Sequence, residues 1–173
     1  IEDGHDTRFD KPKQSFFHFL QYWTGQAMWV AFTCIAVYVA MISEEANTLS
    51  TISLTGLFIW IAGFTIEVIA DAQKRNFRKD LNNKGRYISA GLWSRSRHPN
   101  YFGEITLWVG VSVITLGSLS GVGYVALISP FFVYALLSKG SGIPLLERSA
   151  DKRWGEELEY QEYKKKTPVL FPK

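Results

Sequence analysis

Long stretches with almost no charged side chain constrain the fold of this chain more than any other feature of its sequence. The apolar stretches lie near residues 24–42, 50–71, 101–118 and 122–138. A bilayer core of roughly 30 Å requires about 20 apolar helical residues, whereas a soluble helix normally shows one apolar stripe. The sequence therefore predicts an all-α integral membrane protein with about four transmembrane helices, and we expect residues 1–173 to form a single membrane domain.

The positive charges support the same topology. The 19 Lys and Arg residues fall into three blocks: three precede the first apolar stretch, eight lie in the 72–100 loop, and eight follow from Lys139 onward. The loops 43–50 and 118–122 contain none. Four crossings place all three blocks on one side of the membrane, as the positive-inside rule requires. We therefore expect both termini and the 72–100 loop on the cytoplasmic side or, in a mitochondrion, the matrix side.

Several classes of protein are excluded or disfavoured by composition. Cys34 is the only cysteine, so no intrachain disulfide can form. His5, His18 and His98 are scattered and lack metal-ligand spacing, so we expect no metal centre. The 47% hydrophobic content is too high for a disordered chain. The expected partners are membrane lipids, a lipid-like substrate or other membrane subunits, and no nucleic acid.

The basic loop is the first candidate for a binding site. Between Lys74 and Arg97 there are eight Lys or Arg residues and one acidic residue, Asp80. Arg binds phosphate oxygens in a bidentate manner, which suits a polyphosphate ligand. Attraction to anionic lipid headgroups explains the same charge without a specific site. Charge alone leaves both interpretations open.

Two carboxylates at the basic end of the second apolar stretch are also candidates. Glu67 and Asp71 are four residues apart and so share one face of a helix. A carboxylate facing lipid is costly, so we expect both to face protein, water or a ligand. A structural alternative is that they pair with Lys74 or Arg75 and anchor the end of the helix.

The segment RHPNYFGE, residues 97–104, gives a more specific signal. Pro99 fits the first turn of a helix, and the positive end of such a helix favours anions. Arg97, Tyr101 and Glu104 share one face of that helix, and Asn100 and Glu104 pair in the same way. A helix start needs none of these side chains for structure alone, which favours a functional role.

The C-terminal block combines apolar and charged residues. It begins at Pro144 and includes Leu145, Trp154 and Tyr163 among many charges. We predict an amphipathic interfacial helix. An irregular tail, residues 168–172, is expected to return to the membrane.

The motifs ADAQKRNFR, NKGRYISAGLWSRSRHPNYFGE, SGIPLLERSADKRW and YQEYKKKTPVLFP resemble the steroid 5-alpha-reductase-like membrane family. The resemblance implies a membrane-embedded, NADPH-dependent reductase that reduces a lipid-like or steroid-like enone or double bond. It carries cofactor contacts onto Asp71, Arg78, Asn100 and Glu104, and more weakly onto Glu147, Arg148 and Tyr163. With the basic loop and the 97–104 segment, the predicted cofactor-binding residues are Asp71, Lys74, Arg78, Arg97, His98, Asn100, Tyr101, Glu104, Glu147, Arg148 and Tyr163; no catalytic residue is assigned.

Two other functions stay open. The isoprenylcysteine carboxyl methyltransferases share an RHPxYxG-like block, and this resemblance implies S-adenosylmethionine as the cofactor. The basic loop favours NADPH, because S-adenosylmethionine carries no phosphate. The third possibility is a non-catalytic structural subunit of a larger membrane complex.

The resembling proteins have additional membrane helices upstream, and those helices complete their substrate cavity. This chain starts after that region, with no initiator Met. We therefore expect the isolated 173-residue chain to be catalytically inert even if it binds nucleotide. We also expect the space beside its first two helices to be filled by an upstream segment, partner subunits or lipid.

Overall fold

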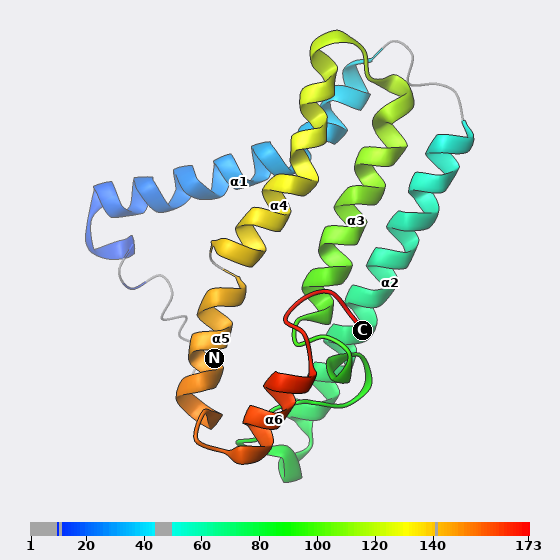
Figure 1. Ribbon diagram of the computed structural model, residues 1–173. Coiled ribbons are helices and arrows are strands. Elements are labelled where there is room, and N and C mark those ends of the chain that lie inside the picture. Colours follow the sequence, from blue (N-terminus) through cyan, green and yellow to red (C-terminus); the bar gives the residue numbers. More distant parts are fainter. Residues whose placement is uncertain (1–9, 11, 44–49, 141) are drawn as a thin grey trace.

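The computed structural model describes residues 10, 12–43, 50–140 and 142–173, and every regular element in these residues is helical (Figure 1). The α-helices are α1 (Phe16–Ile42), α2 (Thr51–Lys79), α3 (Pro99–Thr115), α4 (Ile128–Lys139), α5 (Ile143–Trp154) and α6 (Leu158–Lys166). Short 3-10 helices include Gly91–Ser94 before α3, and Leu116–Ser118 and Gly121–Leu127 between α3 and α4. The predicted all-α membrane fold is confirmed.

Three helical stretches are long and apolar enough to cross a membrane: Phe16–Ile42, Thr51–Lys79 and Gly121–Trp154. The helix α3 has 17 residues, or about 26 Å at 1.5 Å per residue. With the three residues of the following 3-10 helix it reaches about 31 Å, close to the thickness of a bilayer core. A fourth crossing by α3 stays a prediction, as does the side of the membrane on which the basic segments lie.

The helices α2 and α3 pack with their backbones in close approach, and glycines make this possible. A Cβ atom at Gly63 would lie 2.4 Å from the backbone nitrogen of Leu107, and one at Gly110 would lie 2.5 Å from that of Trp60. Small residues at helix interfaces allow such packing in membranes. The α2–α3 pair thereby forms a rigid support for the loop that joins them.

The first helix is longer than predicted, and its N-terminal part is set apart from the other helices. It begins at Phe16 rather than near residue 24, because the apolar segment 16–20 continues the helix. Figure 1 shows its N-terminal part extending sideways, away from α2, α3 and α4. Its C-terminal part packs into a small core in which Ala36, Leu119 and Ala126 are buried.

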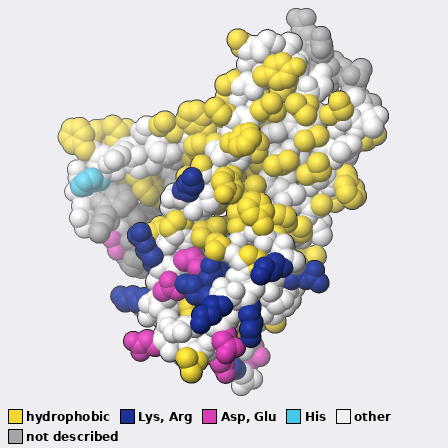
Figure 2. All heavy atoms as spheres, in the orientation of Figure 1, with side chains coloured by type: hydrophobic (Ala, Val, Ile, Leu, Met, Phe, Trp, Pro, Cys, Tyr) yellow, Lys and Arg dark blue, Asp and Glu magenta, His cyan; other side chains and the backbone are white. Residues whose placement is uncertain are grey.

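Charged side chains gather at one end of the molecule. Figure 2 shows this end around α5 and α6, whereas hydrophobic side chains dominate the surface of the remaining body. Helix α2 contributes charged residues to this end, because it continues to Lys79, beyond the predicted end at residue 71. The expected single interfacial helix is divided into α5 and α6 at Gly155, whose backbone N–H donates to Asp151 O and ends α5.

Candidate functional site

The loop between α2 and α3 is fastened to the end of α2. Gly91 adopts a positive φ of +63°, which favours glycine, and opens the short 3-10 helix. The next residue, Leu92, donates its backbone N–H to Gln73 Oε1 at 3.0 Å. The buried Trp93 donates its indole N–H to Ala70 O, also at 3.0 Å. These contacts fix the part of the loop that leads to Arg97.

A cavity of about 180 Å³ lies between the end of α2, this loop, α5 and α6. Its charged and polar lining includes Lys74, Arg78, Arg86, Arg97, His98, Glu147 and Arg153. Its aromatic lining is formed by Phe77, Tyr87, Trp93, Trp154, Tyr160 and Tyr163. Segments far apart in the sequence thus form one site.

The lining of the cavity is strongly positive. Five of its side chains are Lys or Arg, and Glu147 is the one acidic residue among those that line it. Lys74 also lies over the ring of Trp93, with its Nζ 4.7 Å from the ring centroid. A low-dielectric wall with this excess of positive charge attracts an anionic ligand.

Arg97 is the most constrained of these cations. Its side chain is 10% exposed, and its Nη1 lies 3.0 Å from Glu147 Oε2. Nη1 is therefore paired with Glu147, whereas Nε is buried and has no hydrogen-bond partner within the described residues. Buried donors are normally satisfied, and a guanidinium matches phosphate oxygens in geometry and charge. Arg97 and the four other Lys and Arg side chains of the lining therefore fit an anionic ligand in the cavity.

Glu147 joins α5 to the start of α3 and to α6. Its Oε1 accepts a hydrogen bond from His98 Nε2 at 2.9 Å. Lys164 Nζ on α6 lies 3.8 Å from its Oε2. His98 is itself buried and stacks on Tyr101, with ring centroids 5.7 Å apart. Glu147 therefore serves first as the internal counter-ion that holds the charged wall together.

Aromatic side chains from three segments form the opposite wall. Tyr87 lies 5.0 Å from Tyr160 and 5.5 Å from Tyr163, measured between ring centroids. It also lies 5.7 Å from Trp154. Tyr163 donates its hydroxyl to Trp93 O at 2.6 Å. Faces of this kind stack on planar rings, including nucleotide bases.

Two of these phenols are held in the neutral form. Burial and the nearby Glu147 and Asp151 carboxylates raise the pKa of Tyr160 to about 12. Burial also raises the pKa of Tyr163, against the opposing effect of Arg97. Both side chains therefore act as hydroxyl donors at neutral pH.

The structure brings six of the eleven predicted residues into the cavity lining: Lys74, Arg78, Arg97, His98, Glu147 and Tyr163. Four others, Asp71, Asn100, Tyr101 and Glu104, lie on α2 and α3 and do not line it. Arg148 is exposed on α5 and also lies outside the lining. Binding of a cofactor by any of the eleven stays a prediction.

A second polar group lies between α2 and α3. Glu104 is within electrostatic reach of Glu67 and Asp71, and Tyr101 is within reach of Asp71 and Glu104. Asn100 Oδ1 is buried, and the described residues offer it no hydrogen-bond partner. No three His, Cys, Asp or Glu side chains in the described part of the chain lie in an arrangement that could hold a metal ion.

Sequence reasoning missed most of the aromatic wall. Tyr87, Trp93, Trp154 and Tyr160 were not among the predicted site residues, although all four line the cavity. The available signal was the density of aromatic residues in highly charged helices. That pattern also fits an interfacial helix, which is how the C-terminal block was interpreted.

A second, more polar cavity of about 290 Å³ lies beside the first. The two share Phe77, Arg86 and Tyr87 in their linings. The second cavity is also lined by Asn83 and Glu157, among other residues. The two cavities are therefore neighbours on either side of these three residues.

Comparison with known proteins defines the family. The chain belongs to the family described as "Protein of unknown function (DUF1295)", which matches residues 1–167. It is 30% identical over 124 residues to "Probable O-methyltransferase ustE" of Ustilaginoidea virens, a match that covers 70% of this chain and 41% of that protein. No solved structure matches the chain.

Two further relatives carry reductase names. The chain is 29% identical over 119 residues to "3-oxo-5-alpha-steroid 4-dehydrogenase 1" of Rattus norvegicus, covering 69% of this chain and 40% of that protein. It is 30% identical over 120 residues to "Steroid 5-alpha-reductase DET2" of Gossypium hirsutum, covering 69% and 41%. The family resemblance seen in the sequence motifs is confirmed. The chain spans about two fifths of the length of the curated relatives it matches.

Proposed function

We propose that this chain is the cofactor-binding part of an NADPH-dependent membrane reductase that acts on a lipid-like or steroid-like enone or double bond. The observation that carries the proposal is the positive cavity, which is lined by Arg97 and four other Lys and Arg side chains. The names of the rat and cotton relatives support a steroid-type reduction. The apolar helices supply the membrane setting that a lipid-like substrate requires.

The site fits a phosphate-bearing nucleotide better than a cationic cofactor. NADPH carries a pyrophosphate and a 2′-phosphate, which match the five Lys and Arg side chains of the lining. The aromatic wall offers faces for planar rings. The cavity of about 180 Å³ is below the usual range of about 300–1,000 Å³ for a drug-sized ligand, so it would hold one part of the nucleotide. The adjoining polar cavity extends the available space.

Each wall then has a role. Arg97 and Lys74 would hold phosphate oxygens, and Glu147 would serve as the counter-ion of Arg97. Tyr163, neutral and fixed on Trp93 O, would close the aromatic side and exclude water. NADPH, when bound, supplies a hydride for reduction of a carbon–carbon double bond.

The second candidate is an S-adenosylmethionine-dependent membrane methyltransferase. The relative from Ustilaginoidea virens, named as a probable O-methyltransferase, favours it. The charge of the cavity argues against it, because the methyl-bearing sulfonium is a cation and the wall is positive. Binding measurements separate the two directly.

Calorimetry on the purified chain in detergent micelles tests the proposal with NADPH, NADH and S-adenosylmethionine. A charge-assisted contact to the 2′-phosphate is worth about 1.5–3 kcal/mol, so NADPH should bind about one to two powers of ten more tightly than NADH. The variant Arg97→Gln should weaken NADPH binding by a similar factor. The matched control is Arg95→Gln, because Arg95 is an exposed neighbour of equal charge outside the cavity lining.

Three results would contradict the proposal. Tight S-adenosylmethionine binding without NADPH binding would establish the methyltransferase alternative. Equal losses for the Arg97 and Arg95 variants would show that only the general charge of the surface matters. Binding of none of the three cofactors would favour a structural subunit.

A further inference from the structure

The C-terminal segment (Thr167–Lys173) contacts the loop that carries Arg97. The backbone N–H of Arg97 donates to Pro168 O at 2.9 Å. Ser96, which is fully buried, donates its hydroxyl to Leu170 O at 2.8 Å. These two bonds join positions about 70 residues apart in the sequence, and one of them involves the backbone of Arg97 itself.

Two weaker contacts flank this pair. Thr167 donates its hydroxyl to Ser94 O at 3.4 Å. The backbone N–H of Lys173 donates to Arg95 O, also at 3.4 Å. The segment therefore lies against residues 94–97 and contacts each of them.

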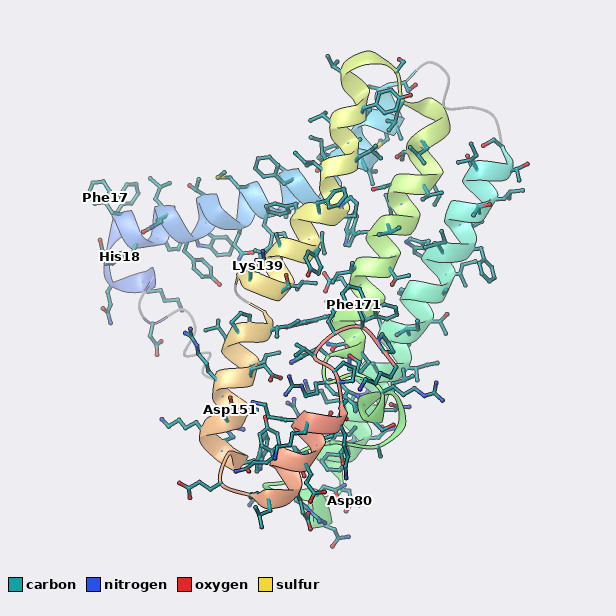
Figure 3. The ribbon with its side chains drawn as sticks, in the orientation of Figure 1. Phe17, His18, Asp80, Lys139, Asp151 and Phe171 are labelled. Atoms are coloured by element: carbon teal, nitrogen blue, oxygen red, sulfur yellow. The ribbon has the colours of Figure 1, made fainter. Side chains whose placement is uncertain are left out.

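Apolar side chains also hold the segment in place. Leu170 is 6% exposed, so its side chain is buried. The ring of Phe171 lies 6.2 Å from Phe102 on α3 and 6.5 Å from Tyr134 on α4, measured between centroids. Figure 3 shows Phe171 beside these two helices, where the charged end of the molecule meets the apolar body.

We propose that the C-terminal segment is a positioning element of the nucleotide site, with Ser96 as its main side-chain contact on the loop. This inference rests on the proposed NADPH-binding function. The segment keeps residues 94–98 in the conformation that directs the Arg97 guanidinium into the cavity. It connects the membrane-embedded ends of α3 and α4 to the charged wall that holds the phosphate.

The physical reason is that the backbone N–H of Arg97 has its acceptor in the C-terminal segment and not within the loop. After the 3-10 helix ends at Ser94 and before α3 begins at Pro99, the loop has no regular structure of its own. Ser96 Oγ also accepts a hydrogen bond from the backbone N–H of His98 at 3.2 Å. Without the C-terminal segment, the backbone of Arg97 would lose its acceptor and would sample several conformations. The apparent affinity for NADPH is proportional to the fraction of molecules whose loop is in the binding-competent conformation.

The test compares NADPH binding by the full chain and by a chain truncated after Thr167. If the competent loop conformation falls to roughly a tenth of the population, NADPH binding weakens about tenfold. The control is Lys173→Ala, because the contact of Lys173 to Arg95 uses backbone atoms and should persist. Addition of the free peptide Pro-Val-Leu-Phe-Pro-Lys should restore affinity to the truncated chain, a rescue that a lasting loss of fold would not show.

If the truncated chain fails to fold, the variant Ser96→Ala tests the positioning role of the C-terminal segment instead. It removes the hydrogen bonds of the Ser96 hydroxyl to Leu170 O and from the His98 backbone N–H, and should weaken NADPH binding about threefold to tenfold in a chain that still folds. Unchanged affinity of Ser96→Ala, or of a folded truncated chain, would overturn this inference while leaving the proposed function intact. Absence of NADPH binding by the full chain would overturn both.

Discussion

Replacement of Glu147 by Gln should change stability and nucleotide affinity in opposite directions. The carboxylate lies 2.9 Å from His98 Nε2, 3.0 Å from Arg97 Nη1 and 3.8 Å from Lys164 Nζ. Its side chain is 19% exposed, so these contacts are only partly screened by solvent. Gln keeps the shape of Glu but leaves three nitrogen-bearing side chains without their shared anion.

The loss of stability can be estimated from these contacts. Hydrogen bonds to charged groups contribute about 1.5–3 kcal/mol, and we expect a free-energy loss in this range. For a chain of this size, about 2–4 °C per kcal/mol converts that loss into a melting temperature lower by about 3–12 °C. Differential scanning fluorimetry in detergent measures it, with the exposed Glu156→Gln as the control of equal charge change.

The affinity for NADPH should rise in the same variant. Glu147 is the acidic member of a lining with five cations, and it repels any phosphate that approaches Arg97. Repulsion between unit charges 8 Å apart is about 2 kcal/mol at an effective dielectric constant of 20, and salt reduces it further. We expect tighter binding by up to about thirtyfold at low salt. An unchanged melting temperature together with unchanged or weaker binding would refute the assignment of Glu147 as an internal counter-ion.

Three further outcomes are expected. Gly63→Ala should destabilise the chain by about 1–3 kcal/mol in thermal unfolding, because its Cβ would lie 2.4 Å from a backbone nitrogen of α3. Gly25→Ala, with no atom within 4 Å, should not, and equal effects would argue against close packing of α2 and α3. The raised pKa of Tyr160, about 12, means that its stabilising contribution is complete below pH 10 and is lost as the pH rises through about 12. A phenol absorbance titration of the chain against its Tyr160→Phe variant checks this, and ionisation of Tyr160 near pH 10 would contradict it. Cysteines introduced at positions 46 and 86 should be labelled from opposite sides of sealed vesicles, and labelling from the same side would disprove the four-helix topology.

The sequence alone was sufficient to predict the class of this protein. Apolar stretches of helical length are a local property of the chain, and a bilayer selects them by length and composition. The motifs at residues 97–104 and in the C-terminal block were likewise specific enough to indicate the steroid 5-alpha-reductase-like family. Neither conclusion depends on how the helices are arranged in space.

The composition of the site depended on that arrangement. Among the basic residues of one short stretch, Arg97 faces the cavity and Arg95 is exposed, although their sequence environments look alike. The difference follows from the path of the loop after Trp93, which is held by contacts to α2 and to the C-terminal segment. Residue spacing cannot predict this difference between Arg95 and Arg97, because spacing rules apply to regular helices and the loop is not a helix.

The long-range contacts were also beyond the reach of the sequence. The residues 168–172 were expected to return to the membrane, and nothing in their composition indicated hydrogen bonds to residues 94–97. Asp71 and Arg97 were both predicted to bind the cofactor, but only Arg97 lines the cavity. Hydrophobic pattern determines which segments are helical and buried in lipid, whereas the meeting of distant side chains is decided by helix rotation, loop conformation and close packing in the folded protein.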